Sequence, residues 1–482
     1  MTQSAPAPVL VWFRYDLRLD DHPALCDAAA KGPVIGLFVL DPALDGRPLG
    51  GAARWWLHHS LTALSAALAD RGIPLLMRAG DAATVVAQEA AAAGVQGVVW
   101  NRGNTPWLRR LDQTAATALA RQGTPHRITA SDLMVEPEAI RTGSGGAFKV
   151  FTPFWKALQA SHRPAAPQTT PDSLRGPGLP GAPAPVPPAP VPPAPVPSDW
   201  ALLPTRPDWA GGLRATWTPG EAGAHQRLHD FLQSRVLTYG ARRDFPADPA
   251  TSRLSPFLRF GEISARRVWQ VTEHLSGDSG LPFLRELAWR EFNHHILFQA
   301  PDLHLQPLRP EFRNFPWRED PAGFAVWCQG KTGYPIVDAG MRELWHTGWM
   351  HNRVRMIVGS FLVKDLLVPW TAGEDWFWDT LVDACPANNP GNWQWVSGCG
   401  ADAAPYFRVF NPVLQGEKFD PDGAYVRRWV PELARKRQGV HRPAEDGDLF
   451  RSPAYPPPMI DHGRARDRAL AAFAALKEQD TP

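Results

Sequence analysis

Short apolar runs alternate with longer helical patterns at the start of the chain, and this alternation restricts the fold more than any other feature. The runs are VLVWF (9–13), VIGLFVL (34–40), PLLMRAG (74–80) and GVVWN (97–101), with stretches such as RWWLHHSLTALSAALADRG (54–72) between them. Buried strands joined by helices form parallel sheets. We therefore expect a Rossmann-like parallel α/β domain over residues 1–135. No GxGxxG follows the first run, so the dinucleotide-binding fingerprint is absent.

A Pro- and Ala-rich segment follows between residues 163 and 200, with the repeat APVPPAPVPPAPVP at 184–197. Such composition favours extended polyproline geometry and resists packing. We expect residues 136–220 to form an interdomain linker that contains this insertion. A ligand for an SH3-type domain is the functional alternative.

The pattern becomes helical after Gly220. Amphipathic windows cover residues 225–239, 282–298, 333–348 and 352–367, and loops rich in Gly, Pro and Asn separate them. We expect an all-α domain over residues 221–482.

Composition and charge limit the class of protein. The net charge of +2 permits a local basic face but is not that of a strongly basic nucleic-acid protein. Four scattered cysteines form no CxxC pair, which argues against zinc and against disulfides, and no run is long enough to span a membrane. The start of the chain does not look like a secretory signal. We expect a cytoplasmic protein without a metal site.

Tryptophan is abundant, with 21 residues, most of them in the second half of the chain. Trp317, Trp370 and Trp393 lie in segments where an indole could carry an electron between a buried cofactor and the surface. Packing is the simpler explanation for any single tryptophan, because large aromatic side chains dominate core energetics.

A second group of candidates lies in ELAWREFN (286–293). Glu286, Trp289, Arg290 and Asn293 recur at i, i+3, i+4 and i+7, so they share one helical face. A carboxylate, an indole and a guanidinium on one face could bind a base and a phosphate.

The segment WMHNRVRM (349–356) places Asn352, Arg355 and Met356 on one helical face and Arg353 on another. An inward Arg355 needs a buried partner, and Asp383 is the candidate.

Two further segments are ambiguous when taken alone. The hydroxyls of TSRLS (251–255) predict an anion site at a helix N-terminus, although Ser and Thr also cap helices routinely. Asn388 and Asn389 lie between Pro and Gly, where asparagine is common in turns.

Long strings of this sequence resemble the photolyase/cryptochrome family, and within it the class I cyclobutane pyrimidine dimer photolyases. The strings are VWFRYDLRLDDHPAL, KVFTPFWKA, RRDFPADPATSRLS, ELAWREF, KTGYPIVDAGMRELWHTGWMHNRVRM, FLVKDLL, NPGNWQW, GADAAPYFRVFNP and QGEKFDPDGAYVRRWVPEL. The resemblance implies an antenna-binding α/β domain and a helical domain that binds a folded FAD. It also implies light-driven electron transfer from reduced FAD to a pyrimidine dimer in damaged DNA. Photolyases belong to the enzymes that flip their target base out of the duplex, so the dimer would be flipped out as well.

The resemblance assigns roles to individual residues. FAD would be bound by Tyr239, Thr251, Ser252, Arg253, Leu254, Ser255, Phe283, Glu286, Asn352, Arg355, Asp383, Ala384, Cys385 and Asn389, with Asn389 beside flavin N5. Catalysis would involve Glu286, Trp289, Asn352, Met356, Asn389 and Trp395, and DNA would contact Glu286, Trp289, Arg290, Asn293, Asn352, Arg353 and Gln415. Trp393, Trp370 and Trp317 would be the inner, middle and outer steps of a photoreduction chain.

Two departures from the family pattern qualify these assignments. Cys385 stands where the family usually has a second acidic residue. Trp107 and Leu108 replace an Asn–Glu pair of folate-binding relatives, so the antenna, if there is one, is methenyltetrahydrofolate or 8-hydroxy-5-deazaflavin.

Other functions compete with repair. A cryptochrome-like photoreceptor would use the same tryptophans without repair, and a simple flavin electron carrier would not prefer damaged DNA. The retained site residues and a short end at LKEQDTP favour repair. We expect a monomer that needs no protein partner.

Overall fold

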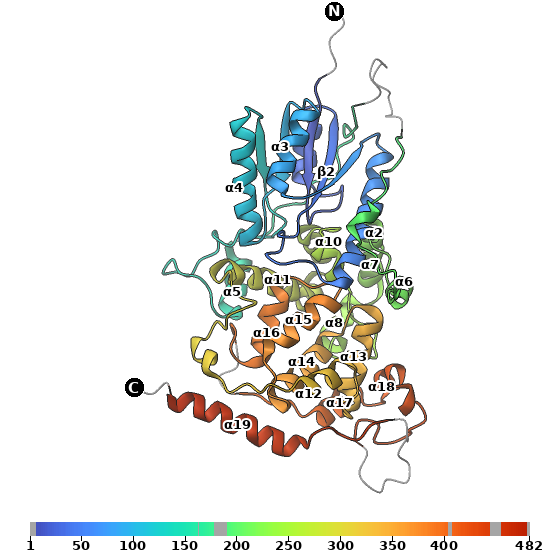
Figure 1. Cartoon of the computed structure of the whole chain (residues 1–482), viewed down its shortest axis with the longest axis vertical. Helices are drawn as coiled ribbons and strands as arrows, with labels where there is room; N and C mark the ends of the chain where they lie inside the picture. The colour runs from blue at the N-terminus through green and yellow to red at the C-terminus, as the bar shows by residue number, and fades with distance from the viewer. Residues whose placement is uncertain (1–5, 162, 178–189, 403–406, 444–454, 480–482) are drawn as a thin grey trace, which may run out of the picture.

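The computed structural model describes residues 6–161, 163–177, 190–402, 407–443 and 455–479. An α/β domain lies at one end of the molecule and a larger helical domain at the other (Figure 1). The expected combination of a parallel α/β domain with a helical domain is confirmed.

Five parallel strands form the α/β sheet in the order β3-β2-β1-β4-β5. They are β1 (Val9–Phe13), β2 (Val34–Leu40), β3 (Leu75–Ala79), β4 (Gly97–Asn101) and β5 (His126–Thr129). The first four coincide with the apolar runs of the sequence. The run-based prediction missed β5, because this edge strand is half-exposed and has the mixed sequence HRIT.

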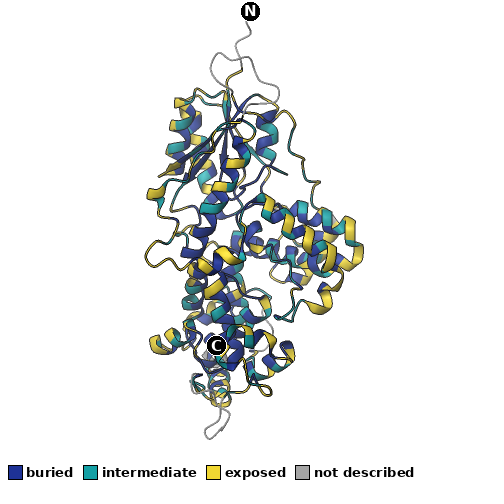
Figure 2. Ribbon diagram, turned by 90° about the vertical axis from the view of Figure 1, so that its right-hand side faces the viewer, coloured by how far each residue is buried: buried dark blue, intermediate teal, exposed yellow. Residues whose placement is uncertain are grey.

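Helices cover both faces of the sheet, whose strands are buried between them (Figure 2). Val9, Val11 and Phe13 of β1 pack toward α1 (Pro23–Ala29) and α2 (Gly51–Ala69). Leu10 and Trp12 pack on the other side against α3 (Ala82–Ala92) and α4 (Pro106–Arg121). Successive side chains of a strand point to opposite faces, so strands covered on both faces are apolar throughout.

The rest of the chain is helical. Its α-helices are α5 (Phe151–Ser161), α6 (Gly211–Thr216), α7 (Glu221–Ser234), α8 (Tyr239–Arg242), α9 (Ser255–Arg259), α10 (Ala265–Ser276), α11 (Leu281–Gln299), α12 (Pro321–Cys328), α13 (Pro335–Thr347), α14 (Asn352–Ser360), α15 (Trp370–Thr380), α16 (Asn388–Ser397), α17 (Pro412–Phe419), α18 (Ala424–Trp429) and α19 (His462–Gln479). A π-helical turn, η5 (Phe361–Asp365), continues α14. Among these described helices, none is long and apolar enough to cross a membrane.

The Pro-rich segment differs in part from its expected behaviour. Its residues 178–189, which include the first six of the fourteen residues of the repeat, lie outside the described residues. Its described flanks pack on the α/β domain: Gly176 N donates to Arg71 O, and Val191 N donates to Ala69 O. Leu174 is buried. The expectation that this composition resists packing is wrong for these flanks, because an extended chain can still bury its occasional Leu and Val side chains.

The two domains are joined by buried polar contacts. Asp21, just before α1, accepts a hydrogen bond from Ser264 and pairs with Arg266 at the start of α10. Arg267 pairs with Asp20 at 2.7 Å. Helix α2 of the α/β domain also lies against α15 of the helical domain. The helical domain therefore meets the α/β domain through specific polar partners as well as through apolar packing.

Candidate active site

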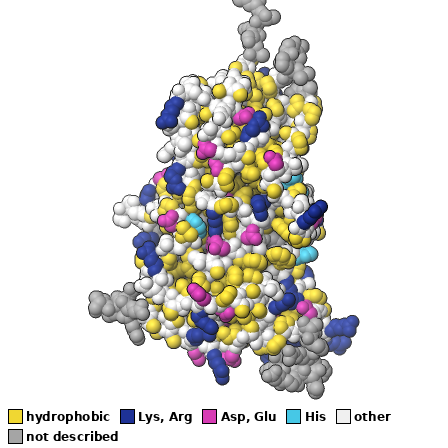
Figure 3. Space-filling model, viewed as in Figure 1, with side chains coloured by type: hydrophobic (Ala, Val, Ile, Leu, Met, Phe, Trp, Pro, Cys, Tyr) yellow, Lys and Arg dark blue, Asp and Glu magenta, His cyan; other side chains and the backbone are white. Residues whose placement is uncertain are grey.

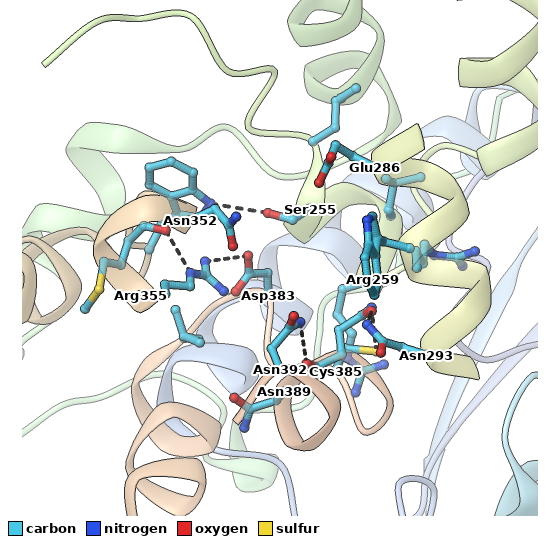
Figure 4. Close-up of a pocket in the computed structure, with 18 of the residues that line it drawn as sticks. Ser255, Arg259, Glu286, Asn293, Asn352, Arg355, Asp383, Cys385, Asn389 and Asn392 are labelled. Atoms are coloured by element: carbon cyan, nitrogen blue, oxygen red, sulfur yellow. Dashed lines mark hydrogen bonds and ion pairs between the residues drawn. The ribbon is translucent and has the colours of Figure 1, made fainter. Parts of the chain in front are cut away.

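A cavity of about 440 Å³ opens into the helical domain and gathers most of the predicted site residues (Figure 4). Its lining comes from α11, α14, α16 and the segment around α9, and Asn104 and Thr105 reach it from the α/β domain. The predicted residues in the lining are Tyr239, Thr251, Ser252, Leu254, Ser255, Phe283, Glu286, Trp289, Arg290, Asn293, Asn352, Arg355, Met356, Asp383, Cys385, Asn389, Trp393 and Trp395.

Helix α11 turns its predicted face to the cavity. Glu286, Trp289, Arg290 and Asn293 all belong to the lining, as their i, i+3, i+4 and i+7 spacing indicates. The indole of Trp289 stacks on the ring of Phe151 from α5, with centroids 3.8 Å apart and planes 7° apart. This stacking fixes the orientation of the indole and leaves it as a rigid apolar wall.

Glu286 has a partner that sequence reasoning missed. Arg243, just after α8, donates to Glu286 Oε1. Burial would lower the pKa of Arg243, but the bond to Glu286 and nearby acidic groups raise it above its ordinary value. Arg243 therefore holds one oxygen of the carboxylate, and among the described residues Oε2 has no hydrogen-bond partner.

Arg355 and Asp383 form the predicted ion pair across the cavity, with 2.8 Å between Nη2 and Oδ2 (Figure 4). The other oxygen of Asp383, Oδ1, is buried and has no hydrogen-bond partner among the described residues. An unpaired buried carboxylate oxygen is costly. A bound group with an N–H or O–H donor would satisfy it.

Helix α14 separates its two arginines as expected. Arg355 lines the cavity, whereas Arg353 does not: it pairs with Asp244 at 2.9 Å and lies over the ring of Phe419. Gln415, on α17, also lies outside the cavity lining. The structure therefore does not bring these two proposed DNA contacts into the cavity itself.

The TSRLS segment leads into a helix as expected. Helix α9 begins at Ser255 and has five residues, and the hydroxyl-bearing residues Thr251, Ser252 and Ser255 line the cavity. Arg253 has a φ of 52°, and its guanidinium lies over Trp349 at 4.6 Å. Arg253 itself is not in the cavity lining, although Trp349, on which its guanidinium lies, is.

The loop before α16 makes polar contacts through the backbone of Ala384 and the thiol of Cys385. The carbonyl of Ala384 accepts a 2.5 Å hydrogen bond from Arg259, and Ala384 is not in the lining. Cys385 Sγ accepts from Asn388 and lies 3.8 Å from His294 Nε2. Burial, reinforced by Arg290, lowers the pKa of His294 to about 4, so this ring is neutral at physiological pH. Sequence reasoning missed His294 and Arg259.

The three tryptophans of the predicted electron path lie in one aromatic core. Trp393 lines the cavity, Trp370 is buried at the start of α15, and Trp317 is half-buried. Gly373 allows Trp393 to pack closely on α15, since a Cβ at that position would lie 2.2 Å from the indole. Trp393 and Trp370 are thus both buried, and Trp317 is the most exposed of the three.

Two family models match the chain. Residues 9–172 match the model described as DNA photolyase, and residues 283–475 match the model described as the FAD binding domain of DNA photolyase.

Individual proteins match over nearly their full length. The chain is 48% identical to a deoxyribodipyrimidine photo-lyase of Agrobacterium fabrum, over 98% of each protein. Among solved structures it is similar to a bacterial class III photolyase from Agrobacterium tumefaciens, with 47% identity, 99% coverage of each chain and a TM-score of 0.91. A cryptochrome from Synechocystis is 27% identical, covers 97% of this chain and 99% of its own, and has a TM-score of 0.83.

Proposed function

Because this chain belongs to the photolyase/cryptochrome family, we propose that it repairs cyclobutane pyrimidine dimers in DNA with light absorbed by FAD bound in the cavity. The 48% identity over nearly the full chain makes it a DNA photolyase that carries FAD. The lesion is the finer proposal. It depends on one observation, the Glu286 carboxylate in a cavity also lined by Trp289 and Trp395.

The lining of the cavity fits a flavin cofactor. Asp383 Oδ1 requires a donor, the hydroxyl-bearing residues Thr251, Ser252 and Ser255 suit a pyrophosphate, and Tyr239 and Phe283 supply apolar surface. Arg355 would hold Asp383 in a fixed orientation toward the bound cofactor. FAD supplies the light-driven electron transfer that this protein chain cannot supply alone.

The proposed substrate subsite combines apolar walls with one carboxyl group. Trp289, Met356 and Trp395 would contact the faces of two flipped pyrimidines, which stack well on aromatic side chains. Glu286 would hydrogen-bond the pyrimidine edge through Oε2, while Arg243 holds Oε1. A pre-oriented polar group placed where charge develops stabilises a transition state.

DNA binding would use contacts around the cavity rather than a single basic field. Basic side chains lie scattered among acidic ones on the face in Figure 3, in keeping with the net charge of +2. We propose that Arg290, Asn293, Asn352, Arg353 and Gln415 contact the strand beside the lesion. A damaged pair is easier to unstack than an intact one, which favours the dimer over normal DNA.

We propose that the protein is a class III rather than a class I photolyase. Support comes from the 47% identity and the TM-score of 0.91 to a class III photolyase over nearly the whole of both chains. The motifs that suggested class I are those of the flavin and substrate cavity. They do not by themselves separate one class from the other.

The remaining sequence expectations stay as proposals. These are the residue ranges 1–135, 136–220 and 221–482 for the antenna domain, linker and flavin domain, and the electron path through Trp393, Trp370 and Trp317. An antenna of the folate or deazaflavin type remains open. A monomer that works on DNA in the cytoplasm also stays a proposal.

A photoreceptor without repair activity is the second candidate, favoured by the similarity to a cryptochrome over 97% of this chain. Illumination of the FAD-loaded protein with a dimer-containing oligonucleotide separates the two functions. Recovery of intact pyrimidines supports repair, and no recovery with fully reduced FAD contradicts it.

The Glu286→Ala variant tests the assigned residue. We expect a several-fold lower repair yield with FAD still bound, because one charge-assisted hydrogen bond is lost. Glu319→Ala removes an exposed carboxylate and serves as the matched control. An unchanged yield in Glu286→Ala would remove the role of Glu286.

A further inference from the structure

The loop between β2 and α2 reaches from the α/β domain onto helix α15. Trp378 Nε1 donates to the carbonyl of Pro48 at 2.8 Å, and Gly51 N donates to Asp379 Oδ1 at 2.7 Å. A Cβ on Gly50 would lie 2.1 Å from the carbonyl oxygen of Trp378, so this approach requires glycine. The loop is therefore held in a fixed position on the helical domain.

Arg47 of this loop is a partly buried cation that pairs with α15. Its guanidinium lies 3.8 Å from the centre of the Trp378 ring. Nη1 donates to Glu374 Oε2 at 2.8 Å, and Nη2 donates to Oε1 of the same carboxylate. Two parallel bonds of this kind fix both distance and orientation, which a lysine could not reproduce.

Glu374 passes this constraint to the cavity. Its side chain is fully buried, and it accepts from Asn389 Nδ2 twice, at Oε1 (2.8 Å) and at the backbone oxygen (2.9 Å). Rotating the amide by half a turn would place Asn389 Oδ1 against two acceptors. The nitrogen of Asn389 must therefore face Glu374, and Oδ1 must face the cavity that Asn389 lines.

The charge on Glu374 strengthens this orientation, which its backbone oxygen also favours. Burial raises the pKa of Glu374, and the bonds and charge of Arg47 oppose that rise. Without Arg47, a protonated Glu374 side chain could donate to Asn389 Oδ1, and only the backbone oxygen of Glu374 would still hold the amide nitrogen. Arg47 thus keeps Glu374 a pure acceptor.

We propose that Arg47, from the α/β domain, is a positioning residue for the flavin: through Glu374 it locks the Asn389 amide so that Oδ1 accepts a hydrogen bond from the reduced isoalloxazine ring. This inference rests on FAD being bound in the cavity. A carbonyl oxygen suits the N–H that a flavin gains on reduction and faces a lone pair in the oxidised ring. Arg47 therefore favours the reduced cofactor.

The test uses the full-length FAD-loaded protein without DNA, so its result does not depend on repair. Reduced FAD is exposed to air in the dark, and its reoxidation is followed by absorption. We expect Arg47→Met to reoxidise about tenfold faster, the size of losing one hydrogen bond to a buried group. The midpoint potential of bound FAD should fall at the same time.

Three further variants decide whether Arg47 acts through Glu374. Adding Arg47→Met to Glu374→Gln should change the rate no further, because two residues acting in series are not additive. Arg47→Lys should give a reoxidation rate between those of the wild type and Arg47→Met, since it keeps the charge. Arg54→Met, at an exposed arginine near the start of α2, should match the wild type.

Two outcomes overturn the proposal. One is a wild-type reoxidation rate in an Arg47→Met protein that is folded and holds FAD. The other is an Arg47→Met effect of full size in the Glu374→Gln background. If Arg47→Met fails to fold, Glu374→Gln decides instead, because a wild-type reoxidation rate and potential in that folded, FAD-loaded variant would show that the Glu374 carboxylate does not act on the flavin.

Discussion

The tryptophans of the α/β domain and those around the cavity of the helical domain differ in what they contact. In the α/β domain Trp12, Trp55, Trp56 and Trp100 are at most 1% exposed and pack only against other side chains. In the helical domain Trp289, Trp393 and Trp395 border a cavity. The first group fills volume, and the second presents a surface. Removing a ring from the first group should therefore cost stability, whereas a change in the second should alter chemistry first.

The largest stability effect is expected for Trp56→Ala. The Trp56 ring contacts Trp217, Phe257 and Phe260, and its N–H donates to Glu262. Losing a fully buried aromatic side chain costs about 3–5 kcal/mol, because little can collapse into the space. Urea unfolding followed by circular dichroism measures the loss. Trp345→Ala, at a side chain that is 58% exposed, is the control. Equal losses of stability in Trp56→Ala and Trp345→Ala would contradict the idea that the buried tryptophans of the α/β domain stabilise the fold by filling volume.

Gly373→Ala should follow, because it forces a methyl group against a cavity-lining ring. The added Cβ would lie 2.2 Å from Trp393, and overpacking of this kind costs about 1–3 kcal/mol. Photoreduction of bound FAD should slow as Trp393 shifts. At Gly359 a Cβ would lie 3.6 Å from the same ring, an ordinary contact, so Gly359→Ala should leave both measurements near wild type. Wild-type behaviour of Gly373→Ala would show that Trp393 is not tightly held.

A smaller, pH-dependent effect is expected at Glu262, the buried partner of Trp56. Burial raises the pKa of Glu262 to about 8, although hydrogen bonds from Ser60, Gly220 N and Trp56 oppose the rise. The folded protein then keeps a proton that the unfolded chain has lost, so stability falls as pH rises from about 5 to about 8. Glu262→Gln cannot ionise and should flatten this part of the melting-temperature profile. A profile parallel to that of the wild type would show that Glu262 is ionised when folded.

The smallest stability effect is expected for Trp317→Phe. This residue is half-buried, and phenylalanine keeps its contact with Phe315. The free energy of unfolding should therefore change by less than about 1 kcal/mol. Photoreduction of oxidised FAD should nevertheless slow, while repair by FAD that is already reduced should stay largely intact. Flash photolysis measures the first and a repair assay the second. Trp209→Phe, at an exposed tryptophan, should alter neither.

Local periodicity correctly predicted features that depend on a single helix or strand. The first four strands, the inward face of α11 and the separation of Arg355 from Arg353 all follow from spacing within one segment. Periodicity says nothing of partners on other elements. It could not find Arg243 beside Glu286 or the Arg47 contact between domains, because those depend on how the helices pack.

Contacts between segments explain the remaining differences. Arg253 belongs to the TSRLS motif, and spacing within that motif could not show that its side chain lies over Trp349 and outside the cavity lining. The Pro-rich flanks were judged by composition, and their hydrogen bonds to the end of α2 come from backbone groups that composition does not reveal.

Those same flanks mark a site for protein engineering. Gly176 and Val191 are both anchored near the end of α2, on Arg71 and Ala69, so the chain leaves and returns at neighbouring points. Closing a longer loop between fixed ends costs only about 0.6 kcal/mol for each doubling of its length. A fluorescent reporter inserted between these anchors should report on the protein in living cells while leaving the flavin cavity undisturbed.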